Sequence, residues 1–338
     1  MDYSPPASSK ARVDRAGVAL GFGDADEEDL QVINNWRSAH AYPLHSSFIS
    51  LKNKAKAASP GALVSQRIKR LPSIQTKLKR YPKMRLSQMQ DIGGDRAVVG
   101  TLAKVYELQQ AIMESPGALK YITEDNYLIQ PKDDGYRSLH LIFKYSAAGD
   151  SPYNGLWLEL QLRSRLQHAW ATALETVDFL HSQALKLGGG TQEWRRFFSL
   201  MGSYIAIREE APLVPNTPKS ESTICEELRT LSAELLPEER LQAFNQVVQR
   251  SGRLSGSRYF LLELDVESKR LDVRGFEDFK TATDQYIVAE NTIAVTNARR
   301  NKEAVLVSVD KLASLKEAYP NFYLNTSDFL KVLRKALA

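Results

Sequence analysis

Two acidic and three basic residues in the first half of the chain have the types and the spacing that phosphoryl-transfer chemistry requires. Arg67, Lys69 and Lys77 lie in the stretch RIKRLPSIQTK, where their cationic side chains can clamp a polyphosphate and neutralise the charge that develops during transfer. Asp91 opens the run DIGGDRAVVG, and Glu159 lies in the run LWLELQLRS. If both runs are strands, the two carboxylates suit Mg²⁺, which usually takes one or two carboxylates together with water and phosphate oxygens.

A polar loop, PKDDGYRSLH, precedes a third apolar run. Its Gly135 lets the backbone pass close to a ligand, and the ring of Tyr136 can stack on a base. Each residue alone has a simpler explanation, because a strand carboxylate usually forms a salt bridge or faces solvent and a lone tyrosine usually packs into a core. The combined order of basic stretch, Asp91, glycine-tyrosine loop and Glu159 favours a nucleotide site.

Short strands must position these side chains. In the run LWLELQLRS, leucines alternate with polar residues, so Glu159, Gln161 and Arg163 share one face while the leucines face a core. The expected strands lie within residues 91–100, 136–145 and 156–164. The expected helices begin near Asp29, cover residues 60–69, 101–115, 165–185 and 192–208, and include a short helix that contains Lys77 and is capped by Ser73.

Composition indicates a globular protein and is compatible with a reducing compartment. The 338 residues are 43% apolar, which is enough to build real cores. The single cysteine, Cys225, excludes an internal disulfide and a cysteine-based zinc cluster. The N-terminal stretch lacks the apolar segment of a signal peptide, and no run approaches the roughly 18 to 20 apolar residues that span a bilayer. We therefore expect a cytoplasmic protein with no membrane partner.

The positive charge is concentrated in one segment. The formal net charge is +5, yet residues 51–90 hold eleven Lys and Arg and neither Asp nor Glu. This segment supplies the whole positive excess. A basic patch of this kind indicates a polyanionic partner, either the phosphates of a nucleotide or a nucleic acid, although a solvated helix surface is the simpler interpretation of a charge run.

The distribution of proline and periodic segments predicts four parts. Residues 1–26 are expected to be a flexible N-terminal arm, residues 27–210 a domain that holds the candidate site residues, residues 211–222 a proline-rich linker, and residues 223–338 a C-terminal accessory domain. In the last part we expect helices at 222–232, 237–250 and 278–290, a hairpin at 257–276, a strand at 304–309 and a helix from Ser327. No chemical constellation occurs there.

Residues 29–210 resemble the RelA/SpoT-type nucleotide pyrophosphokinase domain of alarmone (ppGpp) synthetases. Five motifs, in the order of that family, carry the resemblance: RIKRLPSIQTK, DIGGDR, PKDDGYRSLH, LELQLRS and QHAWATALE. The resemblance implies an α+β fold in which a mixed β-sheet is flanked by helices, related to nucleotidyltransferases. A smaller α/β C-terminal domain would follow it.

The same resemblance implies roles for individual residues. Asp91 and Glu159 would hold Mg²⁺ and support the chemistry, with Glu159 activating the attacking hydroxyl. Tyr136 would stack on the acceptor base. The implied ATP-binding residues are Arg67, Lys69, Ser73, Lys77 and Arg96, and the implied acceptor-binding residues are Lys132, Tyr136, His140, Gln161 and Arg163.

The implied activity is ATP-dependent pyrophosphate transfer to the ribose 3′-hydroxyl of GDP or GTP, which yields a (p)ppGpp-type alarmone and AMP. The alternative is a toxin-type relative that modifies the 3′ end of tRNA, with the C-terminal domain as a fused antitoxin or sensor. A non-enzymatic binding module is disfavoured, because the matched catalytic positions are intact. A homo-oligomer and a protein ligand of the C-terminal domain are left open.

Two features separate this chain from other members of that family. None of its five histidines precedes an aspartate, so the His-Asp metal motif of the family's hydrolase domain is missing and we expect synthesis without degradation. Asp134 precedes Gly135 where many relatives have asparagine, and Asn126 stands where aspartate is usual. The first of these changes places extra negative charge near the phosphates of the acceptor and leaves acceptor identity open.

Overall fold

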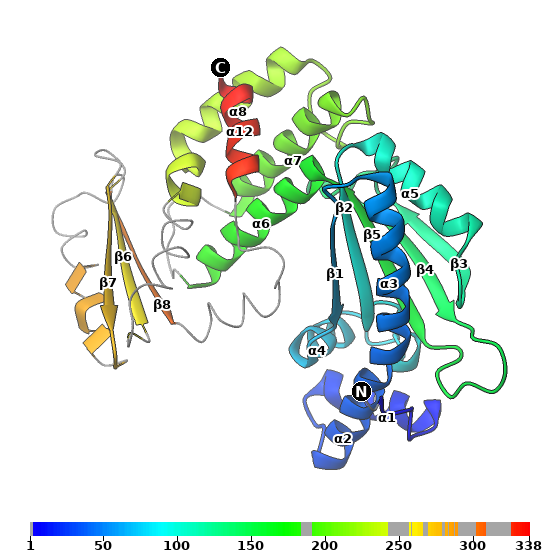
Figure 1. The fold of residues 1–338 in the computed structure, drawn as a ribbon. Helices are drawn as coiled ribbons and strands as arrows, with labels where there is room; N and C mark the ends of the chain where they lie inside the picture. The colour runs from blue at the N-terminus through cyan, green and yellow to red at the C-terminus, as the bar shows by residue number, and fades with distance from the viewer. Residues whose placement is uncertain are drawn as a thin grey trace. The chain divides into compact units, whose positions relative to one another are not determined.

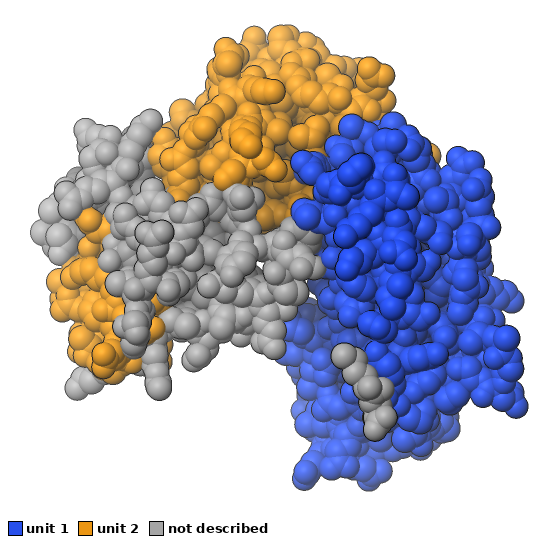
Figure 2. All heavy atoms as spheres, viewed as in Figure 1, with its two compact units in different colours: residues 1–127, 138–165 blue, residues 128–137, 166–338 orange. Residues whose placement is uncertain are grey.

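The computed structural model describes two compact units. It covers residues 3–183, 191–242, 257, 259–265, 270–278, 281–282, 284–286, 288–289, 302–308 and 326–338. The first unit, called the sheet unit, contains Met1–Tyr127 and Ser138–Arg165. The second, called the helical unit, contains Leu128–Arg137 and Leu166–Ala338 (Figure 2).

A mixed five-stranded sheet forms the centre of the sheet unit, in the order β1-β2-β5-β4-β3 (Figure 1). Strands β2 and β5 pair in parallel, and the other neighbours pair antiparallel. The expected mixed sheet is therefore confirmed. The strands are β1 (Leu63–Ile68), β2 (Gly93–Val99), β3 (Leu119–Asn126), β4 (Leu139–Tyr145) and β5 (Trp157–Ser164).

One face of this sheet is apolar and carries two helices. Leu158, Leu160 and Leu162 of β5 are almost completely buried, as their alternation predicts. Helix α3 (Ala41–Ala58) packs along β1 and β2, and α5 (Leu102–Glu114) packs beside it (Figure 1). The helices leave the opposite face of β5, with its polar side chains, to form the site.

The expected flexible arm over residues 1–26 is wrong, because residues 10–22 form helix α1 (Lys10–Phe22). The helix buries Val13, Ala16 and Leu20 in a core shared with α2 (Glu27–Ala39) and α4 (Leu71–Arg80). At Gly17 a Cβ atom would lie only 2.6 Å from Cβ of Leu86, so the glycine allows close packing. Since small residues make this buried stripe weakly apolar, the periodicity is hard to recognise in the sequence.

Both edges of the sheet differ from expectation. The predicted helix over residues 60–69 is wrong, since Leu63–Ile68 form the edge strand β1, which places Arg67 opposite Gly94 of β2. The opposite edge strand, β3, was not predicted. Edge strands are solvent-exposed on several sides and carry polar residues on both faces, so they lose the alternation that identifies a buried strand.

Helices dominate the helical unit, and four of them agree with the predicted ranges. They are α6 (Arg165–Gln183), whose first residue belongs to the sheet unit, α7 (Thr191–Arg208), α8 (Glu221–Leu235) and α12 (Ser327–Leu337). A separate antiparallel sheet has the order β7-β6-β8, with β6 (Tyr259–Asp265), β7 (Arg270–Phe276) and β8 (Lys302–Ser308), so the predicted hairpin and third strand are present. The predicted helices at 237–250 and 278–290 are only partly described, and residues 237–242, 281–282, 284–286 and 288–289 within them are helical.

The predicted domain boundary at 211–222 does not coincide with the division into units. Helices α8 and α12 share one hydrophobic core with α6 and α7, around Phe198, Leu228 and Phe329. The connection between α7 and α8 is itself packed, since Val214 is buried and its amide donates to Ser203 Oγ at 2.9 Å. Among the described helices none is long and apolar enough to cross a membrane.

Candidate functional site

The polar face of the five-stranded sheet carries several of the predicted site residues. In the strand register, Arg96 of β2 and His140 of β4 both lie opposite Gln161 of β5. Registered neighbours point to the same face of a sheet, and Glu159 lies two residues from Gln161 on that face. Arg67 joins the row, because its partner Gly94 is also the partner of Glu159.

Glu159 is held by hydrogen bonds through both of its carboxylate oxygens. His140 Nδ1 lies 2.9 Å from Glu159 Oε1, and Gln161 Nε2 donates to Oε2 at 2.8 Å. Arg96 Nε donates to Gln161 Oε1 at 3.3 Å, which fixes the orientation of the amide. All four side chains are buried, so the network is shielded from water.

This network sets the ionisation of Glu159. Burial raises the pKa of Glu159, but the hydrogen bond and the charge of His140 and the hydrogen bond from Gln161 outweigh burial, and the pKa lies below its ordinary value. Nearby Asp91 acts in the opposite direction and raises the pKa of Glu159, so the two carboxylates are close enough to interact. At neutral pH Glu159 is a fixed, ionised carboxylate that can accept a proton.

Asp91 is bound by two lysines from neighbouring elements. Lys69, just after β1, places Nζ 2.7 Å from Oδ2, and Lys77 of α4 places Nζ 2.8 Å from Oδ1. The amide of Lys69 also donates to Ile92 O at 2.7 Å, which ties the end of β1 to the start of β2. Burial raises the pKa of Asp91, but the two ammonium groups outweigh it and lower the pKa overall.

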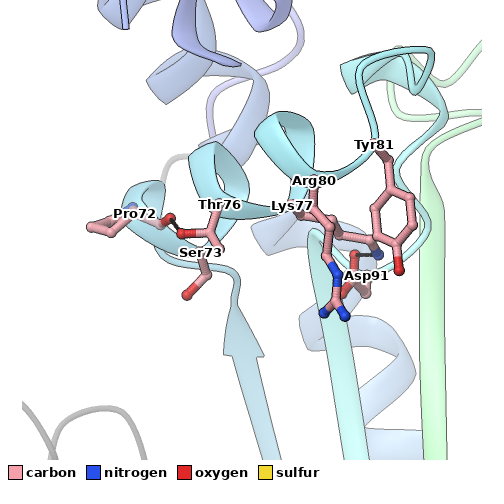
Figure 3. A pocket seen from close by; sticks show the side chains of 7 residues that line it. All are labelled: Pro72, Ser73, Thr76, Lys77, Arg80, Tyr81 and Asp91. Carbon is pink, nitrogen blue, oxygen red and sulfur yellow. Dashed lines mark hydrogen bonds and ion pairs between the residues drawn. The ribbon is translucent and has the colours of Figure 1, made fainter. Parts of the chain in front are cut away.

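A cavity of about 470 Å³ opens beside Lys77 and Asp91 (Figure 3). Most of the residues that line it carry a hydroxyl group or a cation, which an anion site requires. Ser73 lies in the first turn of α4, where the helix dipole favours negative charge, but it does not cap the helix as predicted, because Arg70 occupies the N-cap position. The lining residues are Pro72, Ser73, Thr76, Lys77, Arg80, Tyr81 and Asp91.

Arg80 and Tyr81 were not among the predicted site residues, although both line this cavity. The Arg80 guanidinium lies 5.8 Å from the centre of the Tyr81 ring. A sequence signal for Arg80 was present, because residues three apart on a helix share a face and Arg80 follows Lys77 by three. Tyr81 ends the helix, and its role depends on a loop conformation that periodicity does not report.

Carboxylate oxygens are the hard ligands that Mg²⁺ prefers, and the site offers two carboxylates. Asp91 and Glu159 are the predicted pair, and the charge of Asp91 acts to raise the pKa of Glu159. One or two carboxylates, completed by water and phosphate oxygens, are the usual protein contribution to a magnesium site. The two lysines on Asp91 can transfer to phosphate oxygens, which would free the carboxylate for the metal. The donor set fits the ion.

Arg163 differs from the other polar residues of β5, because its side chain makes a structural contact with the residue before β4. It is almost fully buried, and its Nε lies 3.4 Å from Ser138 Oγ, which in turn donates to Leu162 O at 3.2 Å. These contacts lock the ends of β4 and β5 together. The contact of Arg163 with the acceptor stays a prediction.

Lys132 and Tyr136 belong to the helical unit, where they form a compact loop. Lys132 Nζ lies 5.0 Å from the centre of the Tyr136 ring, and the Tyr136 amide donates to Asp134 Oδ1 at 2.9 Å. Gly135 has a φ of 96°, which few residues other than glycine adopt without strain. A Cβ atom there would lie 2.7 Å from Phe198 O, so the glycine allows the loop to pack on α7.

Arg137, which received no role from the sequence, is a structural clamp. It is almost fully buried, and its guanidinium donates to Leu128 O at 2.9 Å and to Pro212 O. Two carbonyl groups from distant parts of the chain are satisfied by one side chain. Its position next to Tyr136 thereby fixes the end of the loop.

Comparisons with known proteins point to one family. Residues 66–178 match the family model described as a region found in RelA / SpoT proteins. The GTP pyrophosphokinase YjbM of Bacillus subtilis (strain 168) is 26% identical over 126 residues, which are 37% of this chain and 59% of that protein. The match therefore spans less than two thirds of that relative.

Solved structures of small alarmone synthetases also resemble the chain. Small alarmone synthetase 1 of Bacillus subtilis, bound to its product pppGpp, superposes with a TM-score of 0.46 and 20% identity, over 55% of this chain and 94% of that one. A GTP pyrophosphokinase family protein of Streptococcus pneumoniae gives a TM-score of 0.40 and 22% identity, over 50% of this chain and 85% of that one.

Proposed function

Since the chain carries a RelA/SpoT region at residues 66–178, we propose that it is a nucleotide pyrophosphokinase that transfers the β,γ-pyrophosphate of ATP to the ribose 3′-hydroxyl of GDP or GTP. The observation that carries the proposal is the pairing of Asp91 with Lys69 and Lys77 next to the ionised, hydrogen-bonded Glu159. Such a site holds cations for a polyphosphate and a carboxylate for a hydroxyl proton, and pyrophosphate transfer needs both.

The donor half of the reaction belongs to the basic residues. Lys69, Lys77 and Ser73 would bind the phosphates of ATP, and Arg67 and Arg96 supply further positive charge on the sheet face. As the 3′-oxygen bonds to the β-phosphorus, the bond from that phosphorus to the bridging oxygen breaks and AMP leaves with the electron pair. Negative charge grows on the phosphoryl oxygens during this step, so preorganised ammonium groups stabilise the transition state more than the ground state.

The acceptor half requires a base, because a ribose hydroxyl is a poor nucleophile at neutral pH. Glu159 is ionised and oriented by His140 and Gln161, so a carboxylate oxygen can take the 3′-hydroxyl proton as the new bond forms. Mg²⁺, held by Asp91 and Glu159 together with phosphate oxygens, would supply neutralisation of phosphate charge when bound. Glu159 then releases the proton to solvent.

Recognition of the acceptor is assigned to the loop of the helical unit. The ring of Tyr136 would stack on the guanine, and Lys132, which already lies over that ring, would move to a phosphate. The carboxylate of Asp134 accepts a hydrogen bond from the Tyr136 amide, so part of its negative charge is stabilised within the loop. This reduces the conflict between its carboxylate and the phosphates of a guanine nucleotide.

Incubation of the purified protein with Mg²⁺, β-labelled ATP and either GDP or GTP tests the proposal. Label should move to the guanine nucleotide, with one AMP formed for each product molecule. The Asp91→Ala and Glu159→Gln variants should lose transfer, whereas the exposed control Lys104→Ala should keep it. Hydrolysis of ATP without labelled guanine nucleotide would refute the assignment.

A second candidate function is transfer of pyrophosphate to the 3′ end of tRNA. One observation favours it, namely that basic residues of the 51–90 segment outside the phosphate site remain at the surface and can contact a polyanion. The exposed ones are Lys52, Lys56, Arg70, Lys79, Lys83 and Arg85. Deacylated tRNA as the acceptor in the same assay separates the two functions, because label would then appear in RNA.

A further inference from the structure

The acceptor loop is built onto helix α7 by backbone-to-backbone contact. Gly202 of α7 lies against Gly135 of the loop so closely that a Cβ on Gly202 would meet Gly135 Cα at 2.9 Å and Gly135 O at 3.0 Å. One helical turn earlier, Ser199 Oγ donates to Asp133 O at 2.6 Å. Two residues of the loop, Asp133 and Gly135, are therefore held against the same helix.

A continuous series of aromatic rings leads from this loop to the C-terminal helix. Tyr136 meets Trp170 of α6 edge-on, with ring centres 6.4 Å apart, and Trp170 meets Phe198 of α7 at 5.7 Å. Phe198 in turn lies 5.8 Å from Phe329 of α12. The Trp170 indole also donates to Phe198 O at 2.9 Å, and that carbonyl is the atom on which Gly135 packs.

Helix α12 is a firmly anchored end of this series. Phe329 and Leu333 are completely buried in the core of the helical unit. Arg229 Nε of α8 donates to Leu337 O at 3.1 Å, and Arg334 forms an ion pair with Glu238 at 2.6 Å. The helix thus packs the ring of Phe329 against the buried ring of Phe198.

We propose that α12 is a positioning element for the acceptor, which acts through Phe329, Phe198 and Trp170 on Tyr136. The inference rests on the proposed function, because it takes Tyr136 as the platform for the acceptor base. The internal hydrogen bonds of the loop, such as Gly135 N to Lys132 O at 2.9 Å, set its shape but not its place. Its place is set by α7, and the ring of Phe198 in α7 is held by α12.

The test compares acceptor and donor kinetics in four variants of the full chain. Phe329→Ala removes the last ring of the series, and Phe329→Leu restores apolar bulk. Gly202→Ala leaves the core intact but pushes the loop from α7. Leu333→Ala is the matched control, because Leu333 is equally buried one turn along the same helix and is not part of the ring series.

Phe329→Ala and Gly202→Ala should raise the KM for GDP or GTP about 10-fold, since a shift of about 1 Å in a positioning group has at least this effect, while the KM for ATP stays unchanged. Hydrogen exchange of residues 131–137 should become faster in both variants. Phe329→Leu should recover most of the affinity, and Leu333→Ala should change neither measurement.

Three results would overturn the proposal: unchanged acceptor KM in both Phe329→Ala and Gly202→Ala, equal effects of Leu333→Ala and Phe329→Ala, or parallel increases in both substrates' KM values. The wild-type protein distinguishes this failure from failure of the proposed function. If wild type transfers no label to a guanine nucleotide, the function is wrong, and exchange at residues 131–137 still decides whether α12 positions the loop.

Discussion

Lys69 and Lys77 divide the carboxylate of Asp91 between them, with Nζ-to-oxygen distances of 2.7 Å and 2.8 Å. Without a nucleotide, the two ammonium groups therefore occupy both oxygens that a metal ion would need. ATP phosphates are stronger partners for the lysines than a single shared carboxylate, because they carry more charge. On the proposed function, nucleotide binding would release Asp91, and the released carboxylate would then be available to a metal ion.

Metal binding should consequently depend on nucleotide. We expect Mn²⁺, followed by its electron paramagnetic resonance signal, to bind weakly to the protein alone and tightly with a non-hydrolysable ATP analogue. Lys77→Met frees one oxygen of Asp91, so it should strengthen nucleotide-free Mn²⁺ binding. The same variant should lower kcat/KM for ATP by about 100-fold or more, since one preorganised cation is lost.

Lys79→Met is the control for this experiment, because Lys79 is exposed on the same helix and does not line the cavity. It should leave both Mn²⁺ binding and kcat/KM near wild-type values. Equal Mn²⁺ affinity in wild type with and without the analogue would show that the lysines do not compete with the metal.

The pH dependence of transfer should report the contact between His140 and Glu159. His140 lowers the pKa of Glu159, so His140→Phe, which keeps a ring but removes the hydrogen bond, should raise that pKa. A carboxylate base is active only when ionised, and the acid limb of the kcat/KM profile should move to higher pH. Gln161→Met should move it in the same direction by less. An acid limb at the same pH in all three proteins would remove Glu159 as the base.

The ring of Tyr136 should matter for the acceptor and not for the donor. Stacking of a base on an aromatic side chain is worth about 1 to 3 kcal/mol, so Tyr136→Ala should raise the KM for GDP or GTP by about 5- to 150-fold. Tyr136→Phe keeps the ring and should stay near wild type. Steady-state kinetics with each substrate varied in turn measures both effects. A rise in the KM for ATP alone would place the ring at the donor instead.

Asp95 should make the protein less stable as pH rises. Its side chain is buried under α3 near Ser47, and neither carboxylate oxygen has a hydrogen bond of normal geometry among the described residues. Burial raises the pKa of Asp95 to about 8, while the Ser47 hydroxyl opposes this only in part. An unfolded aspartate ionises near the ordinary pKa of 3.8, so the folded protein holds the extra proton between pH 3.8 and about 8 and loses stability as pH rises through this range.

Asp95→Asn removes this titration. The difference in unfolding free energy between Asp95→Asn and wild type should grow by up to about 1.4 kcal/mol per pH unit towards pH 8 and then level off. Urea unfolding between pH 6.5 and 8.5 measures it and avoids the range of buried His40, whose pKa burial lowers to about 4. A difference that is constant with pH would show that Asp95 is ionised in the folded protein.

The strongly periodic parts of the fold were predictable from the sequence. Helices α6, α7 and α12 and strand β5 have long apolar stripes or strict alternation, and their limits agree with expectation to within a few residues. Strand β1 lies at an edge and α1 packs through small residues, so neither shows the usual pattern. The burial of Asp95 could not be recognised, because its neighbours in the sequence are two glycines and an arginine and show no apolar alternation.

For the site, the sequence showed which residues to suspect but not how they are engaged. The split of Asp91 between two lysines depends on α4 folding over the end of β1, which no local pattern reports. The polar row on β5 was expected to be a polar face, yet Glu159 and Gln161 are as buried as core residues. These polar side chains can be buried because Arg96 of β2 and His140 of β4 hydrogen-bond to them. Both partners lie beside β5 only because of the order of the strands in the sheet.

The return of α12 to the core around Phe198 has a consequence for synthesis on the ribosome. Strands β1 to β5 and helices α6 to α8 are all translated before residue 236, whereas α12 comes only at residues 327–337. The nascent chain must therefore keep the surface that will receive Phe329 uncovered while the intervening residues are made. Domains tend to fold as they emerge, but this core closes only after residues 327–337 have been made. An unfinished chain would thus hold Lys69, Lys77 and Asp91 without the support that places Tyr136.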